Sequence, residues 1–305
     1  MRVLVSGGAG FIGSWLCQCL IDEGYKVICV DNFSTGRREN LEGLNIELVE
    51  HDVKKPLELK AEYVFHLASR ASPADFEEHP VDILLTNSLG TYNMLELARR
   101  NKATFLLAST SEIYGDPLEH PQNEGYWGNV NPLGLRSCYN ESKRFSEALT
   151  MSFYRKYGLD VRIARIFNTY GQRMRIDDGR VIPNFISQAL RDEPITVYGD
   201  GTQTRSFCYV SDMVDGLMKL MFAENLDGEV INLGNPKEIS ILRVAALIKR
   251  LVGSDSKIVF KPLPQDDPAR RKPDITRAKE KLKWKPKVGL EEGLRKTIDH
   301  FKRNK

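Results

Sequence analysis

A run of closely spaced glycines near the start of this 305-residue chain leaves few architectures open to it. Residues 3–6 are mostly apolar and predict a strand, and residues 13–23 have the amphipathic pattern of a helix. Between them Gly7, Gly10 and Gly13 form the spacing G-x-x-G-x-x-G. Glycines at this spacing let backbone N–H groups approach a pyrophosphate at the N-terminus of a helix. The alternative is a tight strand–helix turn that binds nothing.

Short strands and longer helices alternate through the first half of the chain, and the strands are almost continuously apolar. This pattern is typical of a parallel sheet covered by helices on both faces. We therefore predict an α/β fold, a doubly wound parallel sheet of the Rossmann type. One expected helix covers residues 84–100, on which Leu85, Leu89 and Tyr92 share a face. The expected strands are residues 3–6, 27–30, 46–49, 63–67, 105–108 and 161–166.

The pattern of predicted elements changes after about residue 168, where turn-rich segments separate short strands and helices. We expect residues 1–167 to form a dinucleotide-binding domain and residues 168–305 a smaller substrate-binding part. Residues 230–233 predict a strand that returns to the main sheet, so segments within about 205–235 should be interleaved with the first domain. A C-terminal amphipathic helix is expected from the spacing of Leu290, Leu294, Ile298 and Phe301.

Composition excludes several classes of protein. Lys and Arg number 44 against 41 Asp and Glu, a net charge of +3, which is too balanced for an electrostatic binder of nucleic acid or membranes. No apolar stretch approaches the length of a membrane span. The five cysteines contain no C-x-x-C pair and the five histidines lack ligand spacing, so we expect neither a disulfide framework nor a metal site. Met1-Arg2 leads directly into the first strand without a targeting segment, and we expect cytoplasmic residence.

An acidic residue closes the second expected strand. Asp31 follows Gly7 by 24 residues, which is close to the spacing at which a carboxylate reaches the ribose of a bound dinucleotide. Such a carboxylate accepts hydrogen bonds from the ribose hydroxyls and repels a 2′-phosphate, so NAD is favoured over NADP. Arg37 and Arg38 leave NADP open as the alternative.

Two further patterns bring hydroxyl, carboxylate and basic groups together. Tyr139 and Lys143 stand at i and i+4 and share one face of a helix, where a nearby ammonium should lower the pKa of the phenol from about 10. Thr110 and Glu112 follow the strand 105–108, at the edge where parallel sheets bind ligands. The alternatives are a surface pair for the first pattern and a helix-capping turn for the second.

Together these residues resemble the extended short-chain dehydrogenase/reductase superfamily of nucleotide-sugar enzymes, over essentially the whole chain. Within it the sequence is most similar to the UDP-glucuronate decarboxylases. Ser111-Glu112, with Arg-Lys-Pro at 271–273, matches these, whereas the 4,6-dehydratases carry Asp-Glu at 111–112 and the 4-epimerases usually lack the second carboxylate. The resembling stretches are residues 31–37, 69–73, 126–132, 165–171 and 265–274. The departures lie at Arg70 and Leu135, where proline is usual, at 140–142 and near Phe76.

The resemblance implies a reaction in which NAD takes a hydride from C4 of the sugar and returns it after CO2 has left C5. It implies that Tyr139 is the base, that Lys143 lowers its pKa and holds the ribose, that Thr110 orients the 4-hydroxyl, and that Glu112 and Arg271 serve decarboxylation and C5 reprotonation. The implied cofactor contacts are Gly7, Gly10, Phe11, Ile12, Gly13, Asp31, Asn32, Ser34, Thr35, Asp52, Val53, Leu67, Ser69, Thr86, Tyr139 and Lys143. The implied contacts of the UDP-sugar are Ser72, Thr110, Asn168, Arg180, Arg205 and Arg271.

Several alternatives stay open at this point. The nearest is a UDP-glucuronate or UDP-hexose 4-epimerase, followed by a 4,6-dehydratase and by a regulator that binds NAD or a nucleotide sugar without turnover. Each arginine has the alternative of a surface ion pair. Cys138 is expected to be a buried structural thiol rather than a nucleophile. The resemblance also implies a homodimer formed through residues 84–100 and 139–157.

Overall fold

The computed structural model describes residues 1–264 and 266–303. Its centre is a seven-stranded sheet with the strand order β11-β6-β5-β4-β1-β2-β3, and every neighbouring pair is parallel. The α/β fold with a Rossmann-type sheet is therefore confirmed. The strands are β1 (Arg2–Ser6), β2 (Lys26–Asp31), β3 (Glu47–Glu50), β4 (Tyr63–His66), β5 (Thr104–Thr110), β6 (Val161–Ile166) and β11 (Glu229–Leu233).

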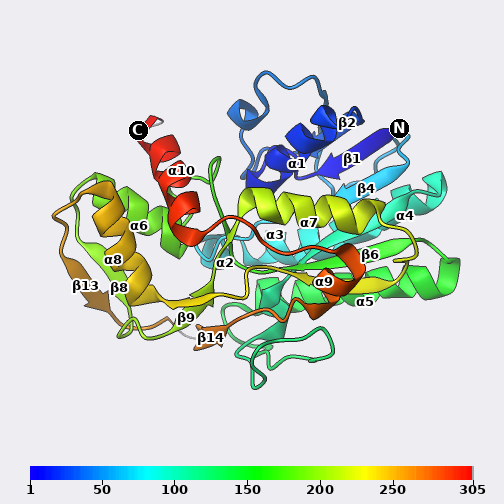
Figure 1. Ribbon diagram of the computed structural model, residues 1–305. Coiled ribbons are helices and arrows are strands. Elements are labelled where there is room, and N and C mark those ends of the chain that lie inside the picture. The colour runs from blue at the N-terminus through cyan, green and yellow to red at the C-terminus, as the bar shows by residue number, and fades with distance from the viewer. Residues whose placement is uncertain (265, 304–305) are drawn as a thin grey trace.

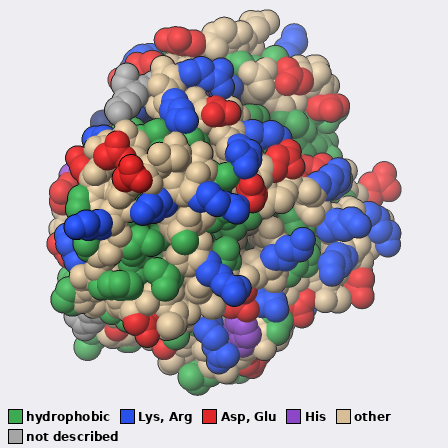
Figure 2. Space-filling view, turned by 60° about the vertical axis from the view of Figure 1, so that its left-hand side comes forward, with side chains coloured by type: hydrophobic (Ala, Val, Ile, Leu, Met, Phe, Trp, Pro, Cys, Tyr) green, Lys and Arg blue, Asp and Glu red, His purple; other side chains and the backbone are tan. Residues whose placement is uncertain are grey.

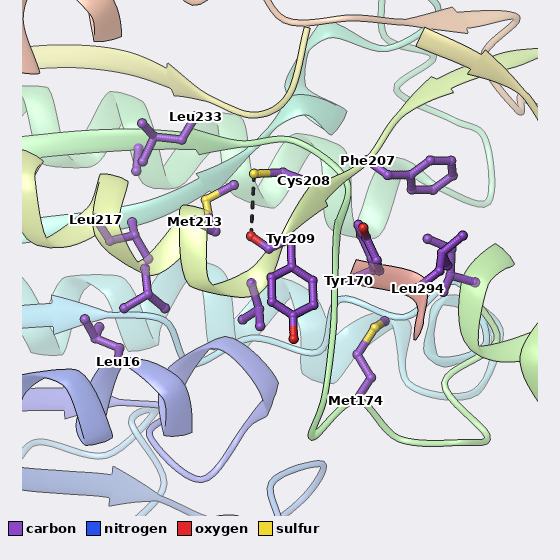
Figure 3. Packing of buried hydrophobic residues seen from close by; sticks show 14 of the residues in the cluster. Leu16, Tyr170, Met174, Phe207, Cys208, Tyr209, Met213, Leu217, Leu233 and Leu294 are labelled. Carbon is purple, nitrogen blue, oxygen red and sulfur yellow. Dashed lines mark hydrogen bonds between the residues drawn. The ribbon is translucent and has the colours of Figure 1, made fainter. Parts of the chain in front are cut away.

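Helices cover both faces of this sheet (Figure 1). Because successive strand residues point to opposite faces, each strand supplies two separate cores. Val3 and Val5 of β1 pack in the core that holds α1 (Phe11–Asp22) and α7 (Val210–Phe222), and part of this core is drawn in Figure 3. Leu4, between them, packs with α4 (Thr91–Asn101) and α5 (Ser137–Tyr157).

The helix expected over residues 84–100 is not continuous. The chain forms α3 (Pro80–Leu85), a π-helical turn η2 (Thr86–Gly90) and then α4. Gly90 lies in tight contact at this turn, since a Cβ there would come within 2.8 Å of Val53. The expected shared face also differs from a core-facing stripe, because Leu85, Leu89 and Tyr92 are 43–45% exposed. π-helical turns of this kind are frequent at functional sites.

The second half of the chain is interleaved with the sheet. β11 pairs with the edge strand β6, and α7 packs against α1. The remaining elements build a smaller lobe beside the carboxyl ends of the strands (Figure 1). Its helices are α6 (Val181–Leu190), α8 (Ile241–Val252) and α10 (Leu290–Arg303), and its strand pairs join β8 (Ile195–Tyr198) with β13 (Ile258–Lys261), β7 (Thr169–Tyr170) with β10 (Cys208–Tyr209), and β9 (Thr204–Ser206) with both β12 (Glu238–Ser240) and β14 (Arg270–Arg271). Short connecting helices are η1 (Arg38–Leu41), α2 (Asp75–Glu78), η3 (Ser111–Tyr114) and α9 (Thr276–Leu282).

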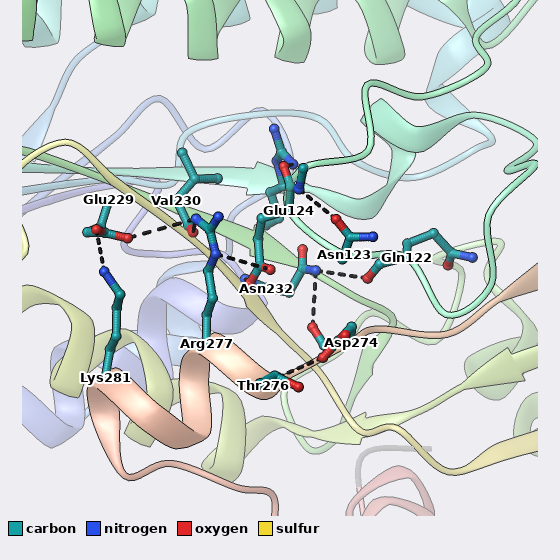
Figure 4. Close-up of polar contacts among 12 residues, drawn as sticks. Gln122, Asn123, Glu124, Glu229, Val230, Asn232, Asp274, Thr276, Arg277 and Lys281 are labelled. Carbon is teal, nitrogen blue, oxygen red and sulfur yellow. Dashed lines mark hydrogen bonds and ion pairs between the residues drawn. The ribbon is translucent and has the colours of Figure 1, made fainter.

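A buried polar cluster anchors the segment after β14 to the main sheet. Asn232 of β11 donates from Nδ2 to the carbonyls of Gln122 (3.0 Å) and Asp274 (3.2 Å), as Figure 4 shows. Its Oδ1 accepts a hydrogen bond from the Tyr114 hydroxyl at 2.8 Å. The backbones of Gln122 and Lys272 are also hydrogen-bonded, at 2.9 Å. The segment after β14 is therefore held by contacts to Asn232, 42 positions from Asp274, and to Gln122, 150 positions from Lys272.

On the face seen in Figure 2, basic and acidic side chains are interspersed with hydrophobic ones. Such a mixture of signs keeps the electrostatic field short in range at physiological salt. Among the described residues, no helix has both the length and the apolar character that crossing a bilayer requires.

Candidate active site

A cavity lies at the carboxyl ends of β1, β2, β4, β5 and β6, between the main sheet and the smaller lobe. Ligands of doubly wound sheets bind at this edge, outside the ends of the strands. Both halves of the chain contribute to its lining, from Gly7 after β1 to Arg271 in β14. The cavity thus brings together the glycine motif, the tyrosine–lysine pair and the arginines of the second half.

The glycine motif forms a turn in which larger residues do not fit. Gly7 has a φ of +74°, and a Cβ on it would lie 2.7 Å from the backbone N of Ala68. A Cβ on Gly13 would lie 2.1 Å from the carbonyl O of Gly7. Helix α1 begins at Phe11, so Gly13 lies in its first turn, and no side chain caps its N-terminus at Gly10. Its first N–H groups and the positive end of its dipole face the cavity, as binding of a dinucleotide pyrophosphate requires.

Asp31 ends β2 and lines the same cavity while being 7% exposed. Burial raises the pKa of its carboxyl, and the N–H groups of Phe33 (2.8 Å to Oδ1) and Ala9 (2.9 Å to Oδ2) oppose that shift. Each oxygen keeps a further lone pair for a ribose hydroxyl. Arg37 pairs with Asp177 at 3.6 Å instead of lining the cavity. Arg38, the other basic residue considered for NADP, pairs with Glu50 and stacks on Phe33.

Almost all residues expected to contact the cofactor line the cavity. They are Gly7, Gly10, Phe11, Ile12, Gly13, Asp31, Asn32, Ser34, Thr35, Val53, Leu67, Ser69, Thr86, Tyr139 and Lys143. Asp52 is the exception. Its Oδ1 accepts a hydrogen bond from the backbone N of Lys54 at 2.9 Å, and its other oxygen lies 3.4 Å from the Lys54 ammonium. Asp52 does not line the cavity, although its neighbours His51 and Val53 do, and its contact with the cofactor stays a prediction.

Tyr139 and Lys143 lie one turn apart on α5, and both are buried. The Tyr139 ring stacks on Phe76, with 5.3 Å between ring centroids and an interplanar angle of 19°. The Lys143 Nζ donates to the carbonyl of Ala108 at 2.9 Å and lies 5.9 Å from the centre of the Tyr139 ring. Lys143 is therefore held by β5 rather than by the phenol.

Burial moves the pKa values of this pair apart. It raises the pKa of Tyr139 to about 12, although a hydrogen bond with Thr110 favours the phenolate. It lowers the pKa of Lys143 to about 8, with the charge of Glu147 acting in the opposite direction. The expected lowering of the Tyr139 pKa by Lys143 is wrong for the protein without ligands, because the cost of a buried charge outweighs the effect of its neighbours.

Thr110 and Glu112 occupy the end of β5 and the turn that follows. The strand reaches Thr110, two residues further than expected, because Ser109 and Thr110 still pair with β6. The Thr110 hydroxyl accepts a hydrogen bond from the backbone N of Glu112 at 3.2 Å and so caps η3. It lines the cavity at the same time, so the capping and ligand-facing interpretations both hold geometrically.

Two arginines bind the Glu112 carboxylate, one at each oxygen. Its Oε2 lies 2.7 Å from Nη2 of Arg136, and its Oε1 pairs with Nη1 of Arg271. Burial opposes ionisation, but the charges and hydrogen bonds of Arg271 and Arg136 outweigh it and lower the pKa of Glu112 to about 2. Glu112 is therefore a carboxylate at neutral pH.

The arginines of the second half converge on the same region. Parallel pairing of β14 with β9 places Arg271 directly beside Arg205, which donates to Asp267 at 2.8 Å. Arg180 forms a two-point ion pair with Asp178. Arg271 is 3% exposed, and among the described residues its Nε and Nη2 have no hydrogen-bond partner. Two buried donors are thus available for an anion. The other expected substrate contacts, Ser72, Thr110 and Asn168, also line the cavity.

Sequence reasoning missed three members of this cluster. The sequence patterns gave no reason to select Arg136, yet its guanidinium binds Glu112. Asp267 and Asp178 balance the charges of Arg205 and Arg180. No pattern in the sequence identifies these pairings, because each depends on how the chain is folded. Gln265, which opens the resembling stretch 265–274, lies outside the described residues.

The glycine loop, the acidic end of β2 and the tyrosine–lysine pair face one cavity at the edge of a Rossmann sheet. This arrangement defines a class of α/β enzymes that depend on a nucleotide cofactor. A family model described as "NAD dependent epimerase/dehydratase family" matches residues 3–234, and the chain belongs to this family. It is 55% identical to UDP-glucuronic acid decarboxylase 4 of Arabidopsis thaliana, over 99% of this chain and 69% of that protein. It is also 55% identical to UDP-glucuronic acid decarboxylase 1 of Danio rerio, over 99% of this chain and 73% of that protein.

Solved structures of related enzymes share the fold over the whole chain. UDP-glucose 4-epimerase of Thermotoga maritima, solved with UDP-glucose, superimposes with a TM-score of 0.92 at 34% identity and covers 100% of this chain and 99% of that one. UDP-glucuronic acid 4-epimerase of Bacillus cereus, solved with UDP-glucuronic acid and NAD, gives a TM-score of 0.92 at 29% identity, with both chains fully covered. Decarboxylases and epimerases therefore both occur among the relatives.

Proposed function

We propose that this chain is an NAD-dependent UDP-glucuronate decarboxylase that forms UDP-xylose through a 4-keto intermediate. The observation that carries the proposal is the Glu112–Arg271 pair beside Tyr139 in one cavity. A carboxylate and a guanidinium with free donors are suited to a reaction in which a sugar carboxylate is bound and then removed as CO2. The identity of 54–55% to several UDP-glucuronic acid decarboxylases over nearly the whole chain supports the same function.

The nucleotide cofactor that fits this cavity is NAD. Gly7 and Gly13 allow the tight turn that brings the N-terminus of α1 to the cavity, and Asp31 is placed to accept ribose hydroxyls and to disfavour a 2′-phosphate. When bound, NAD supplies a hydride acceptor and donor for C4 of the sugar. Tyr139 and Lys143 would hold its nicotinamide ribose, as the family resemblance implies.

Tyr139 is proposed to accept the proton of the 4-hydroxyl, with Thr110 orienting that hydroxyl. The hydrogen bond between Thr110 and Tyr139, together with the charges of Arg180 and Arg136, favours the phenolate that a base requires. Lys143 supplies a further positive charge at neutral pH, because its pKa lies at about 8. A C4 ketone turns the substrate into a β-keto acid, so the C5–C6 bond breaks with its electron pair delocalised into an enolate.

Glu112 and Arg271 are proposed to act on the C5 side of the reaction. Arg271 has unpartnered Nε and Nη2 groups that suit the sugar carboxylate and, after CO2 has left, an ordered water. Glu112 is ionised at neutral pH, so it serves as a hydrogen-bond acceptor and base rather than as an acid. The proton that returns to C5 would then come from water.

The UDP moiety is proposed to bind the arginines of the smaller lobe, with Asn168 and Ser72 beside them. Among the described residues of this lobe, five arginines line the cavity against two carboxylates, which leaves a positive excess that suits a diphosphate. The arginines are Arg173, Arg175, Arg180, Arg205 and Arg271, and the carboxylates belong to Asp178 and Asp267. In this proposal residues 1–167 bind NAD and residues 168–305 the nucleotide sugar, with β11 and α7 returned to the main sheet.

We further propose a homodimer. Leu84, Leu85, Leu89 and Tyr92 are 40–45% exposed on α3, η2 and α4, and Phe145 on the adjoining α5 is 50% exposed. An apolar strip across neighbouring helices is the kind of surface that a second copy covers. Cytoplasmic residence stays a prediction; the five cysteines are free thiols, which is usual in a reducing compartment, and cell fractionation tests it.

Incubation of the protein with UDP-glucuronate and NAD+ tests the function directly. The decarboxylase requires release of CO2, formation of UDP-xylose and little net NADH. UDP-galacturonate without CO2 would establish the second candidate, a 4-epimerase, which the Bacillus cereus structure makes the natural alternative. Bound NAD without turnover of any UDP-sugar would instead indicate a regulator.

The Glu112→Gln variant sharpens this assay. It keeps the size of the side chain but removes the charge that Arg136 and Arg271 bind. We expect a decarboxylase to lose CO2 release by a factor of about 10 or more, the effect of one buried charge-assisted interaction, while an epimerase would keep its rate. The rates of CO2 release and of sugar epimerisation are measured side by side.

A further inference from the structure

Apart from a weak effect on the Tyr139 phenolate, none of the proposed steps explains the position of Arg136. It stands immediately before α5, the helix that carries Tyr139, and its side chain is 15% exposed. Its Nη2 donates to Glu112 at 2.7 Å, and its Nη1 lies 3.9 Å from Asp267. Its Nε is buried without a hydrogen-bond partner. A guanidinium in this environment is costly unless its carboxylate partner is well placed.

The Arg136 guanidinium also lies against Phe76, the ring on which Tyr139 stacks. Its central carbon lies 5.6 Å from the centre of the Phe76 ring, and Phe76 in turn stacks on Tyr139 at 5.3 Å. Phe76 therefore contacts both Arg136 and Tyr139, and Arg136 is hydrogen-bonded to Glu112. The carboxylate proposed for the C5 side is thus tied to the phenol proposed for C4 through packed, buried groups.

The geometry at Glu112 shows why two arginines are present. Arg271 holds Oε1 and Arg136 holds Oε2, so neither oxygen is free to rotate away. A glutamate side chain with one partner would retain rotamers that point elsewhere in the cavity. Arg136 is supported by Asp267 and by Phe76, whereas Arg271 is supported by β14, so the two arginines approach from different parts of the chain.

We propose that Arg136 is a positioning residue for decarboxylation. It fixes the Glu112 carboxylate against Arg271, so that Glu112 and Arg271 stand at C5 of the sugar while Tyr139 stands at C4. This inference rests on the proposed decarboxylase function. In the step concerned the C5–C6 bond breaks, its electron pair passes into the C4 carbonyl as an enolate, CO2 leaves, and a proton from water adds at C5. Oxidation at C4 depends mainly on Tyr139 and Thr110, and of the groups that favour the Tyr139 phenolate Arg136 acts most weakly.

The Arg136→Gln variant separates the two steps. In single-turnover experiments with UDP-glucuronate and NAD+, we expect NAD reduction to change by less than about threefold. CO2 release should fall by about tenfold or more, the loss expected for a charge-assisted hydrogen bond. NADH and the 4-keto sugar should therefore accumulate. Arg136→Lys keeps the charge and should recover part of the CO2 release.

The pH profile supplies a readout that a merely structural role would not move. The charged and titratable groups around Glu112 are Arg136, Arg271, Arg205, Asp267 and Tyr139. Removing Arg136 takes away one of the two cations that hold the pKa of Glu112 low, so that pKa rises. CO2 release by Arg136→Gln should consequently fall off on acidification at a higher pH than in the wild type.

Arg144→Gln is the matched control. Arg144 lies on the same helix, but its guanidinium donates to the carbonyls of Ile113 (3.2 Å) and Trp127 (2.6 Å) outside the cavity. Its variant should keep the wild-type ratio of CO2 release to NAD reduction. The inference is overturned if Arg136→Gln slows both steps alike or neither, if lysine recovers nothing, or if Arg144→Gln changes the ratio equally. Absence of CO2 with the wild-type protein would refute the proposed function itself and this inference with it.

Discussion

The phenol of Tyr139 and the ammonium of Lys143 lie in the same buried cavity, yet their pKa values move in opposite directions. Burial favours the neutral form of each group, which raises the pKa of Tyr139 to about 12 and lowers that of Lys143 to about 8. The local i, i+4 relationship therefore places the two groups but does not by itself activate the phenol. Thr110, Arg180 and Arg136 act to favour the phenolate.

Tyr139→Phe should bind NAD and UDP-sugar nearly as the wild type does but lose turnover about 100-fold or more, the usual contribution of a positioned base. Only the hydroxyl is removed, and the stacking on Phe76 stays. The measurement is kcat for CO2 release, with binding followed by calorimetry. Tyr154→Phe, which removes a surface hydroxyl from the same helix, is the control. Retention of more than about a tenth of kcat, a penalty under ~1.4 kcal/mol, would show that Tyr139 is not the base.

Among the elements, the break between α3 and α4 has the clearest consequence. The π-helical turn η2 places Thr86 in the lining of the cavity, while Leu89 and Tyr92 are exposed on the outer surface. A periodicity that would normally mark a core face here marks an exposed one. Because α3, α4 and α5 pack side by side, their exposed apolar residues form one strip.

Replacing Tyr92 with glutamate tests whether this strip is covered by a second copy. A buried, unpaired carboxylate in a dimer interface is strongly unfavourable, so the variant should be a monomer of unchanged fold. Mass from light scattering on a sizing column, together with circular dichroism, measures both properties. Leu118→Glu, at a leucine that is 80% exposed on a loop, should leave the mass unchanged. A wild-type protein of monomer mass would refute the dimer.

The molecule as a whole is held together around the cavity by buried polar contacts as well as by its cores. The Asn232 side chain links β11, η3 and the segments around Gln122 and Asp274. Arg271 lies three residues before Asp274, so this cluster also fixes the strand that carries it. The stability of the fold and the placement of a cavity residue are thus coupled.

Asn232→Leu should lower the free energy of unfolding by roughly 2–4 kcal/mol, because it leaves several buried polar groups without partners. Urea unfolding followed by circular dichroism measures this change. Turnover should fall as well at temperatures where the variant remains folded, since β14 is less firmly held. Asn123→Ala, in the neighbouring surface turn, should change stability by less than about 0.5 kcal/mol. Equal effects of the two substitutions would show that the Asn232 cluster has no special weight.

Local patterns in the sequence were sufficient for much of the fold. Strand and helix periodicity arises from which residues face a core, so the six expected strands all formed, with shifts of one or two residues at their ends. The glycine spacing, Asp31, and the pairing of Tyr139 with Lys143 depend on neighbours along the chain or on one short crossover. These were predictable before any tertiary contact was known.

The tertiary structure decided what depends on distant partners and on burial. The grip of Arg136 and Arg271 on Glu112, and the register that sets Arg205 beside Arg271, join segments that are up to 159 residues apart. No periodicity encodes such contacts, because they arise only when β14 docks beside β9. The pKa of Tyr139 likewise follows from desolvation, which depends on how the chain packs around the phenol. Sequence spacing therefore determined the scaffold and the identity of the reactive groups, and only long-range packing determined their partners and their charge.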